Sequence, residues 1–315
     1  MLNQEAYELF EHTCDYAENF GLRLHSVAGG RLLDAGVQTP GSLDAGLLLA
    51  RLCMGDQADI AIVPADPDRF VTSNHVHVRT DAPLWACLGA QYAGWPVQTD
   101  DFFAMGSGPM RLLRGREAAL KDLGLAEEGP IAVGVLESDK LPGESVFAHI
   151  AQECGIQPDG VHLAIAPSHS IAGGAQVVAR SIETAMHKLH ELKFDVRSIV
   201  SATGTAPLPP PSKPGDMVSG IGRTNDAMLY GANVTLWADA DDQAIESVIE
   251  QVPSSSSGDY GRPFAQIFKG YEYDFYKVDP MLFSPARVTI HGLRSGRTWI
   301  AGRFNTDVLR ESFLG

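Results

Sequence analysis

Hydrophobic residues recur along the chain at two different spacings, and segments of the two kinds alternate. Apolar residues three or four positions apart predict helices near residues 3–20, 43–54, 83–92, 111–125, 145–154 and 173–194. Short apolar runs, or apolar residues at every second position, predict strands near residues 22–27, 31–34, 58–64, 75–79, 95–98, 131–136, 161–166, 231–238 and 288–291. Such alternation is typical of an α/β fold, here of mixed α+β character.

Chain length and one proline-rich segment indicate how the chain divides. A chain of 315 residues exceeds one typical core, so we expect two lobes, approximately residues 1–185 and 186–315, which need not be continuous. Residues 201–222 are rich in Pro, Gly and Ser and predict the loop that joins the lobes. We expect a layered sandwich of helices and sheets, with the active site in the cleft between the lobes.

Composition narrows the classes of partner and location. The net charge of −15 would repel a polyanion, so no nucleic-acid partner is expected. No apolar run approaches the roughly 18 residues of a spanning helix, and the first residues lack the pattern of a signal peptide. We therefore expect a cytoplasmic protein with no membrane partner. Cys14, Cys53, Cys87 and Cys154 are widely spaced and are expected to be free thiols.

The predicted helix over residues 173–194 carries the first candidate chemistry. Its apolar stripe faces one side, and Arg180, Glu183 and His187 lie three or four residues apart on the other. By pattern alone, a surface ion pair is the ordinary explanation. The alternative is a cleft in which Arg180 tunes Glu183 as an acid and base.

A glycine-rich segment, residues 106–111, is the second candidate. Glycines allow backbone N–H groups to approach an oxyanion or a ligand carbonyl closely, although a simple turn also explains the pattern. No Gly-Lys-Ser/Thr follows, so the segment is not a phosphate-binding P-loop. The candidate binding residues are Gly106, Ser107, Gly108, Pro109 and Arg111.

Two further segments combine small and hydrogen-bonding residues. Residues 167–174 precede a predicted helix and could bind a polar group or simply cap that helix. Residues 222–231 place three hydrogen-bonding side chains together, which could bind the amide and amine edge of a pterin or provide a helix N-cap. The candidates are Ser168 and Ser170 in the first segment, and Thr224, Asn225 and Asp226 in the second.

His75 and His77 raise a different possibility. The H-x-H spacing places both side chains on one side of a strand, as in zinc-dependent amidohydrolases. The ordinary explanation is two polar residues on an exposed strand face. Further metal ligands cannot be recognised by spacing, and no GxSxG, HExxH or GxGxxG motif is present.

Five segments, in this order, resemble the methenyltetrahydromethanopterin cyclohydrolase family: residues 34–46, 106–111, 167–173, 176–183 and 222–231. The similarity extends from about residue 30 to about residue 305. The resemblance implies a two-lobed α/β chain, usually a homotrimer, that holds a pterin substrate between the lobes. It implies no metal and no bound cofactor, because the tetrahydromethanopterin-type pterin is itself the substrate carrier.

The resemblance also implies a reaction. Water would open the methenyl bridge of the cationic substrate, or of a dephospho relative, to give the N5-formyl derivative in one-carbon metabolism. The family's Arg and Glu, three residues apart on a helix, correspond to Arg180 and Glu183, and one carboxyl group can act first as base and then as acid. Two alternatives are a zinc-dependent amidohydrolase that uses His75 and His77, and a non-catalytic pterin-binding subunit.

Overall fold

The structure is a computed structural model that describes residues 1–315, apart from the side chain of Tyr276. The chain forms two compact units, each built from two stretches of sequence. The first consists of Met1–Asp59 and Trp85–Gln176, and the second of Ile60–Leu84 and Val177–Gly315. The sequence predicts one boundary near residue 185, whereas the longer stretch of the second unit begins at Val177.

The first unit is built on a six-stranded mixed sheet with the strand order β1-β2-β8-β7-β6-β5. Strand β8 is parallel to both of its neighbours, and the other pairs are antiparallel. The strands are β1 (Arg23–Val27), β2 (Gly30–Asp34), β5 (Trp95–Thr99), β6 (Phe102–Ser107), β7 (Ala132–Glu137) and β8 (Val161–Ala166). The helices are α1 (Leu2–Cys14), α2 (Leu43–Cys53), α4 (Met110–Arg114), α5 (Ala118–Leu123), α6 (Glu144–Cys154) and α7 (Ile171–Val178), which reaches the unit boundary, with 3-10 turns at Ala17–Phe20 and Pro158–Gly160.

Helices cover both faces of this sheet. On one face, α1 and α2 pack against Val133 and Val135, and on the other α6 packs against Leu163 and Ile165. Because successive side chains of a strand point to opposite faces, both sets of residues are apolar in a strand covered on both sides. Continuous apolar runs of this kind made β7 and β8 recognisable in the sequence.

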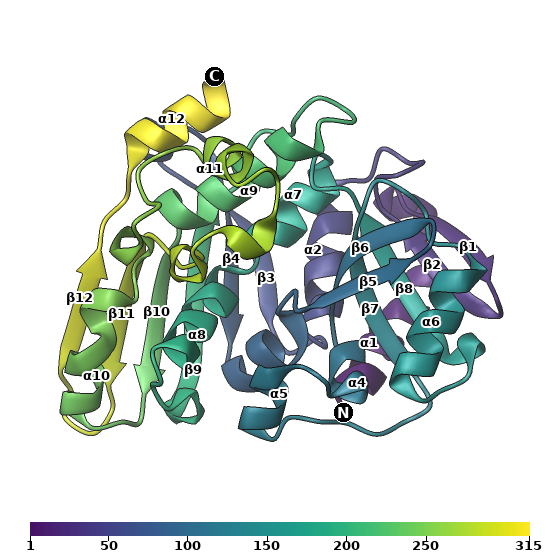
Figure 1. Cartoon of the computed structure of the whole chain (residues 1–315), viewed down its shortest axis with the longest axis horizontal. Helices are drawn as coiled ribbons and strands as arrows, with labels where there is room; N and C mark the ends of the chain where they lie inside the picture. Colours follow the sequence, from purple (N-terminus) through teal and green to yellow (C-terminus); the bar gives the residue numbers. More distant parts are fainter. The chain divides into compact units, whose positions relative to one another are not determined.

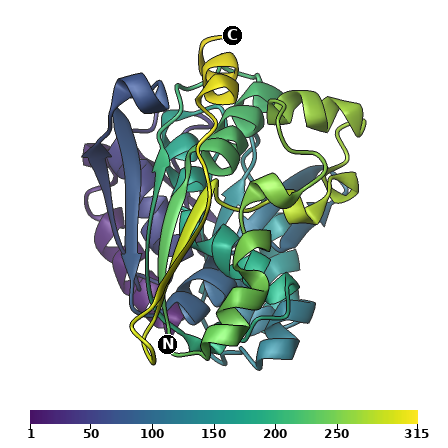
Figure 2. The same ribbon diagram turned by 90° about the vertical axis from the view of Figure 1, so that its left-hand side faces the viewer.

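The second unit contains another six-stranded sheet, with the order β12-β11-β10-β9-β4-β3. Figure 1 shows β9, β10, β11 and β12 side by side, and Figure 2 looks onto the β12 edge of the sheet, with α12 at the C-terminal end of the chain. The strands are β3 (Asp59–Pro64), β4 (Asn74–Thr80), β9 (Ile199–Pro207), β10 (Asn233–Ala238), β11 (Arg287–Gly292) and β12 (Thr298–Gly302).

Two helices of the second unit contact this sheet directly and matter for the site. Helix α8 (Ser181–Glu191) contacts β9 and β10, and α9 (Met217–Gly231) contacts β9. The remaining helices are α3 (Pro67–Phe70), α10 (Asp242–Val248), α11 (Phe264–Gly270) and α12 (Thr306–Leu314), with 3-10 turns at Val196–Ser198, Ile249–Gln251, Ser254–Ser256, Phe275–Lys277 and Pro280–Leu282.

The structure refines or corrects several of these predictions. Residues 201–222 do not join the units but lie within the second one, because they begin in β9 and end in α9. Alternate small residues of β9, such as Ala202 and Ala206, are buried, and the Pro-rich composition hid this alternation. The predicted helix over residues 111–125 is broken after Arg114, where Gly115 adopts a positive φ of 58° and ends α4. Residues 84–91, which lie within the predicted helix over residues 83–92, do form a helix, of the π type.

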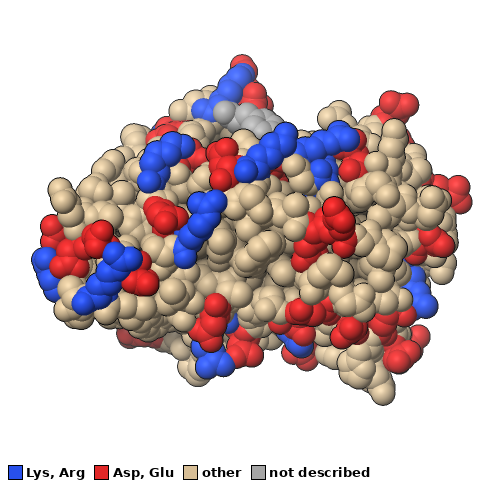
Figure 3. Space-filling model, turned by 90° about the horizontal axis from the view of Figure 1, so that it is seen from below, with Lys and Arg blue, Asp and Glu red and all other residues tan. Residues whose placement is uncertain are grey.

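The surface charge, the helices and the cysteines bear on the expectations drawn from composition. On the face seen in Figure 3, Lys and Arg side chains are interspersed with Asp and Glu, and no continuous basic patch is present there. Within the described residues, no helix has both the length and the apolar character needed to cross a membrane. All four cysteines are free, as expected.

Candidate active site

Arg180 and Glu183 lie where one helix ends and another begins. Helix α7 ends at Val178, and α8 begins at Ser181 with Arg180 as its N-cap residue. Glu183 is therefore the third residue of α8. The exposed fractions of Arg180 and Glu183 are only 8% and 5%, so a surface ion pair does not describe them.

The break between α7 and α8 corrects the single helix predicted over residues 173–194. The Arg180 N–H donates to the Val177 carbonyl at 3.1 Å, and this hydrogen bond closes a tight turn. The Thr184 N–H donates to the Arg180 carbonyl at 3.0 Å, which begins the hydrogen-bond pattern of α8. At the start of α8, Ser181 packs against Gly204 of β9 so closely that no β-carbon would fit on that glycine. This tertiary contact, which hydrophobic periodicity cannot reveal, accompanies the new helix start.

The location of Glu183 in the first turn has an electrostatic consequence. Free N–H groups and the helix dipole favour a negative charge at a helix N-terminus. Burial of a carboxyl group acts in the opposite direction, because it favours the neutral acid. Glu183 thus combines burial with a position at a helix N-terminus.

The glycine-rich segment lies in the first unit, where β6 leads into α4. Gly108 has a φ of 101°, and a β-carbon there would meet the backbone of Val133 and Gly134. The Ser107 hydroxyl is buried and donates to the Val135 carbonyl at 3.2 Å. The same hydroxyl oxygen lies 3.0 Å from the Cys53 sulfur, with which it is also hydrogen-bonded. The segment therefore packs closely on β7, and glycine is required for that approach.

Arg111 has a local structural role. Its side chain is fully buried, and its Nη1 donates to the carbonyls of Leu88, Gly89 and Ala90 at 2.9–3.2 Å. Its Nε donates to the Glu117 carboxylate at 2.9 Å. Arg111 thus ties the end of the π-helix, Leu84–Gln91, to α4, and these contacts occupy most of its N–H groups.

The remaining candidates are also held by local contacts. Ser170 caps α7, since its hydroxyl accepts from the Gly173 N–H at 3.0 Å and donates to the Pro167 carbonyl at 2.8 Å. Ser168 is buried at 3% exposure. These observations fit the capping explanation for Ser170, and binding of substrate by either serine stays a prediction.

Thr224, Asn225 and Asp226 lie inside α9, so the alternative of an N-cap is wrong. The cap of α9 is Asp216, whose carboxylate accepts from the Ser219 N–H. Thr224 and Asn225 donate to the carbonyls of residues 220 and 221 one turn earlier. No helix was predicted at these residues, because the glycines in the first half of α9 obscured the helical pattern.

Burial strongly perturbs Asp226, a carboxyl group of the second unit. Its Oδ1 accepts from the Phe264 N–H at 2.8 Å, and its Oδ2 is buried without a hydrogen bond of acceptable geometry. Burial raises the pKa of Asp226 to about 7, a shift that the Phe264 N–H and the nearby Ser312 hydroxyl only partly oppose. This carboxyl group can change its charge near neutral pH.

His75 and His77 have structural explanations. His75 is buried and packs edge-on against the Phe70 ring with centroids 4.4 Å apart, and burial lowers its pKa to about 4. His77 is hydrogen-bonded to the Thr203 hydroxyl at 2.9 Å. Among the residues whose side chains are described, no group of three or more His, Cys, Asp or Glu could hold a metal ion.

The predicted residues fall into two groups. Residues 106–111, Ser168 and Ser170 belong to the first unit, on strands β6 and β8 that flank β7, or just beyond them. Residues 180–183 and 224–226 belong to the second unit, on α8 and α9, which both contact β9. Within the second unit, the two helices that carry these residues therefore both contact the same strand.

Lys188 is a buried cation on α8 with an exposed fraction of 1%, and it was not among the predicted site residues. Its Nζ donates to the Ser256 hydroxyl at 3.0 Å and to the Met281 carbonyl. Burial lowers the pKa of Lys188 to about 8. Lys188 lies three residues after Ala185 and four before Leu192, which both belong to the apolar stripe. This spacing indicates that Lys188 lies on the buried face of the helix, and it was the available signal.

Comparison with known proteins gives a consistent result. A family model described as Cyclohydrolase (MCH) matches residues 1–313. Methenyltetrahydromethanopterin cyclohydrolase from Rhodopirellula baltica is 61% identical over 99% of this chain and 94% of its own length. The proteins of that name from Methylobacillus flagellatus and Methanocella arvoryzae are each 40% identical over 99% of this chain, covering 95% and 98% of their own lengths.

Proposed function

The chain belongs to the cyclohydrolase (MCH) family, as its motifs predict, and we propose that it hydrolyses the methenyl bridge of methenyltetrahydromethanopterin or a dephospho relative. The product is the N5-formyl derivative. The observation that carries the chemistry is the burial of Arg180, the N-cap residue of α8, and of Glu183, in the first turn of the same helix. Nothing in the contacts of His75 or His77 favours the zinc amidohydrolase.

Glu183 is the proposed proton carrier. Its carboxylate takes a proton from water as the water oxygen bonds to the cationic methenyl carbon. The resulting acid then protonates the departing nitrogen as the C–N bond breaks. The new hydroxyl loses its proton as the formyl C=O forms, so one proton is released per substrate cation hydrolysed.

Arg180 is the proposed partner of Glu183. Its positive charge favours the carboxylate that must accept the first proton, and its planar guanidinium can hold that carboxylate in one orientation. The substrate cation supplies the electrophile. In this proposal the protein's contribution is to position water and move protons.

The substrate-binding set remains part of the proposal. It consists of Gly106, Ser107, Gly108, Pro109, Arg111, Ser168, Ser170, Thr224, Asn225 and Asp226. The N–H of Gly108 is not open to a ligand, because Gly108 is buried and this N–H donates to the Ala90 carbonyl at 2.8 Å. Residues 106–111 would therefore contribute mainly through the fold of their segment. Arg111 would act by holding that segment in place. We also propose a cytoplasmic homotrimer without a bound cofactor, on the basis of the family resemblance.

The decisive experiment follows the absorbance of a methenyl-pterin incubated with the purified protein. Hydrolysis erases the amidinium chromophore, whereas a non-catalytic binding subunit would leave it intact. Loss of the chromophore at a rate proportional to protein concentration supports the proposal, and binding without loss contradicts it. Stoichiometric zinc that disappears in His75→Ala would instead favour the amidohydrolase.

A further inference from the structure

A loop-rich segment of the second unit, residues 254–283, is fixed to the helix that carries Glu183. The Lys188 ammonium on α8 bonds to Ser256 near one end of the segment and to Met281 near the other. Lys188 follows Glu183 by five residues on the same helix. The segment therefore lies against the proposed catalytic helix, within one compact unit.

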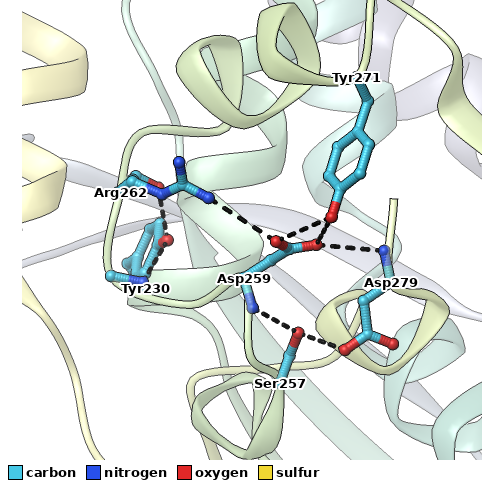
Figure 4. Close-up of polar contacts among 7 residues, drawn as sticks. Tyr230, Ser257, Asp259, Arg262, Tyr271 and Asp279 are labelled. Atoms are coloured by element: carbon cyan, nitrogen blue, oxygen red, sulfur yellow. Dashed lines mark hydrogen bonds and ion pairs between the residues drawn. The ribbon is translucent and has the colours of Figure 1, made fainter. Parts of the chain in front are cut away.

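Asp259 closes the base of a shorter strap inside this segment, residues 272–278. The Tyr271 hydroxyl, just before the strap, lies 3.1 Å from both Asp259 carboxylate oxygens, and the Asp279 N–H, just after it, donates to the same carboxylate at 3.3 Å. Arg262 adds an ion pair at 3.7 Å. Figure 4 shows these groups converging on Asp259, so both ends of the strap are held at one point.

The strap itself has a strained backbone. Glu272 and Tyr273 have φ values of 57° and 63°, in the left-handed region that residues other than glycine rarely adopt. Lys277 forms ion pairs with Glu272 at 3.6 Å and with Asp274 at 3.8 Å, which hold the turn closed. Strain of this kind persists where the surroundings enforce it, and it is frequent at ligand clamps.

The strap adds two exposed rings to an aromatic cluster of Phe264, Phe268, Tyr273, Phe275 and Phe283. The Phe275 and Phe283 rings are stacked with centroids 4.8 Å apart, and the Tyr273 ring meets Phe268 edge-on at 5.5 Å. Phe264 is fully buried, but the exposed fractions of Tyr273 and Phe275 are 52% and 42%. The cluster thus has a buried base and an exposed rim.

We propose that Tyr273 and Phe275 bind a planar ring of the substrate beside the helix that carries Glu183. The inference rests on the proposed function, because that function supplies a substrate with flat rings. Aromatic rings attract other rings in stacked or edge-on geometry, and one such pair changes an affinity by about three- to tenfold. Holding the exposed rings in a strained strap keeps them oriented before the ligand arrives.

The test compares Tyr273→Ala with Tyr16→Ala. Tyr16, with an exposed fraction of 50%, matches Tyr273 at 52% but lies in the first unit at the end of α1. We expect Tyr273→Ala to raise KM for the methenyl-pterin about three- to tenfold, with kcat changed less than twofold. Tyr16→Ala should leave both constants unchanged, and Tyr273→Phe should restore the wild-type KM.

Phe275→Leu provides a second variant that keeps an apolar side chain over the buried base and removes the ring. It should raise KM in the same range. A wild-type KM in both Tyr273→Ala and Phe275→Leu overturns the inference while leaving the proposed function intact. Failure of the wild-type protein to erase the methenyl absorbance would instead refute the proposed function itself.

Discussion

Gly204 of β9 and Ser181 of α8 approach so closely that a β-carbon on Gly204 would overlap the Ser181 hydroxyl. Ser181 follows Arg180 directly and precedes Glu183 by two residues. The contact therefore fixes the first turn of α8 against the sheet. The position of the proposed catalytic pair depends on a glycine that is more than 20 residues away in the sequence.

We expect Gly204→Ala to displace this turn. Overpacking of a buried site destabilises a protein by about 1–3 kcal/mol, and the displaced turn should also reduce turnover. Gly270→Ala is the matched control, because no atom outside its own helix lies within 4 Å of its β-carbon position. Denaturant unfolding and the methenyl absorbance assay measure the two effects. Equal stability and turnover in both variants would show that α8 tolerates the change.

Glu183→Gln should abolish most of the activity without unfolding the protein. Glutamine keeps the shape of the side chain but cannot exchange protons, so turnover should fall by roughly 100- to 10,000-fold. The control is Glu191→Gln, on the same helix with an exposed side chain, which should retain wild-type turnover. Near wild-type turnover of Glu183→Gln at an unchanged melting temperature would exclude Glu183 as the proton carrier.

Arg180→Lys tests whether charge alone is sufficient beside Glu183. Lysine keeps the positive charge but loses the planar group that can bind a carboxylate through two parallel bonds. We expect lower turnover and a displaced pH–rate profile, measured between pH 5 and pH 9 with the same absorbance assay. A profile that coincides with that of the wild type would mean that Arg180 does not set the protonation of Glu183.

The fold was predictable where burial leaves a direct mark on the sequence. Residues of β7 and β8 are apolar on both faces, and their continuous apolar runs predicted strands. Two short strands were predicted near residues 22–27 and 31–34, and the structure pairs them as β1 and β2 across a turn at Gly29, which has a positive φ of 87°. These features depend on neighbouring residues alone.

Features that depend on distant residues could not be predicted in this way. The break before Ser181 accompanies its packing against Gly204, and the burial of Arg111 depends on carbonyl groups of the π-helix. The chemistry of Arg180 and Glu183 came from the family resemblance, since periodicity favoured a surface pair. Their burial is a three-dimensional property that the helical pattern did not contain.

Arg111→Met should be strongly destabilising, even though it places an apolar residue in a buried site. Three backbone carbonyls would each lose a hydrogen bond, and Glu117 would lose its charged partner. Removal of one member of a buried ion pair costs about 3–5 kcal/mol. The control is Arg116→Ala, whose side chain is 58% exposed and should matter by less than about 1 kcal/mol. Comparable unfolding free energies for the two variants would argue against the structural role of Arg111.

Asp226→Asn should stabilise the protein in a pH-dependent manner. The pKa of Asp226 is raised from 3.8 to about 7 by burial, so between these values the folded state holds a proton that the unfolded chain has released. The wild-type stability therefore falls as the pH rises through this range, and the loss is complete above about pH 7. Asparagine does not titrate and can still accept the Phe264 N–H, so the variant avoids this loss.

We expect Asp226→Asn to raise the free energy of unfolding, measured in urea, by a few kcal/mol at pH 8. This gain should nearly disappear at pH 4, because a shift of one pKa unit corresponds to about 1.4 kcal/mol. Asp307→Asn, at an exposed position of α12, should show no such dependence. A gain for Asp226→Asn that is the same at both pH values would mean that Asp226 is not protonated in the folded protein.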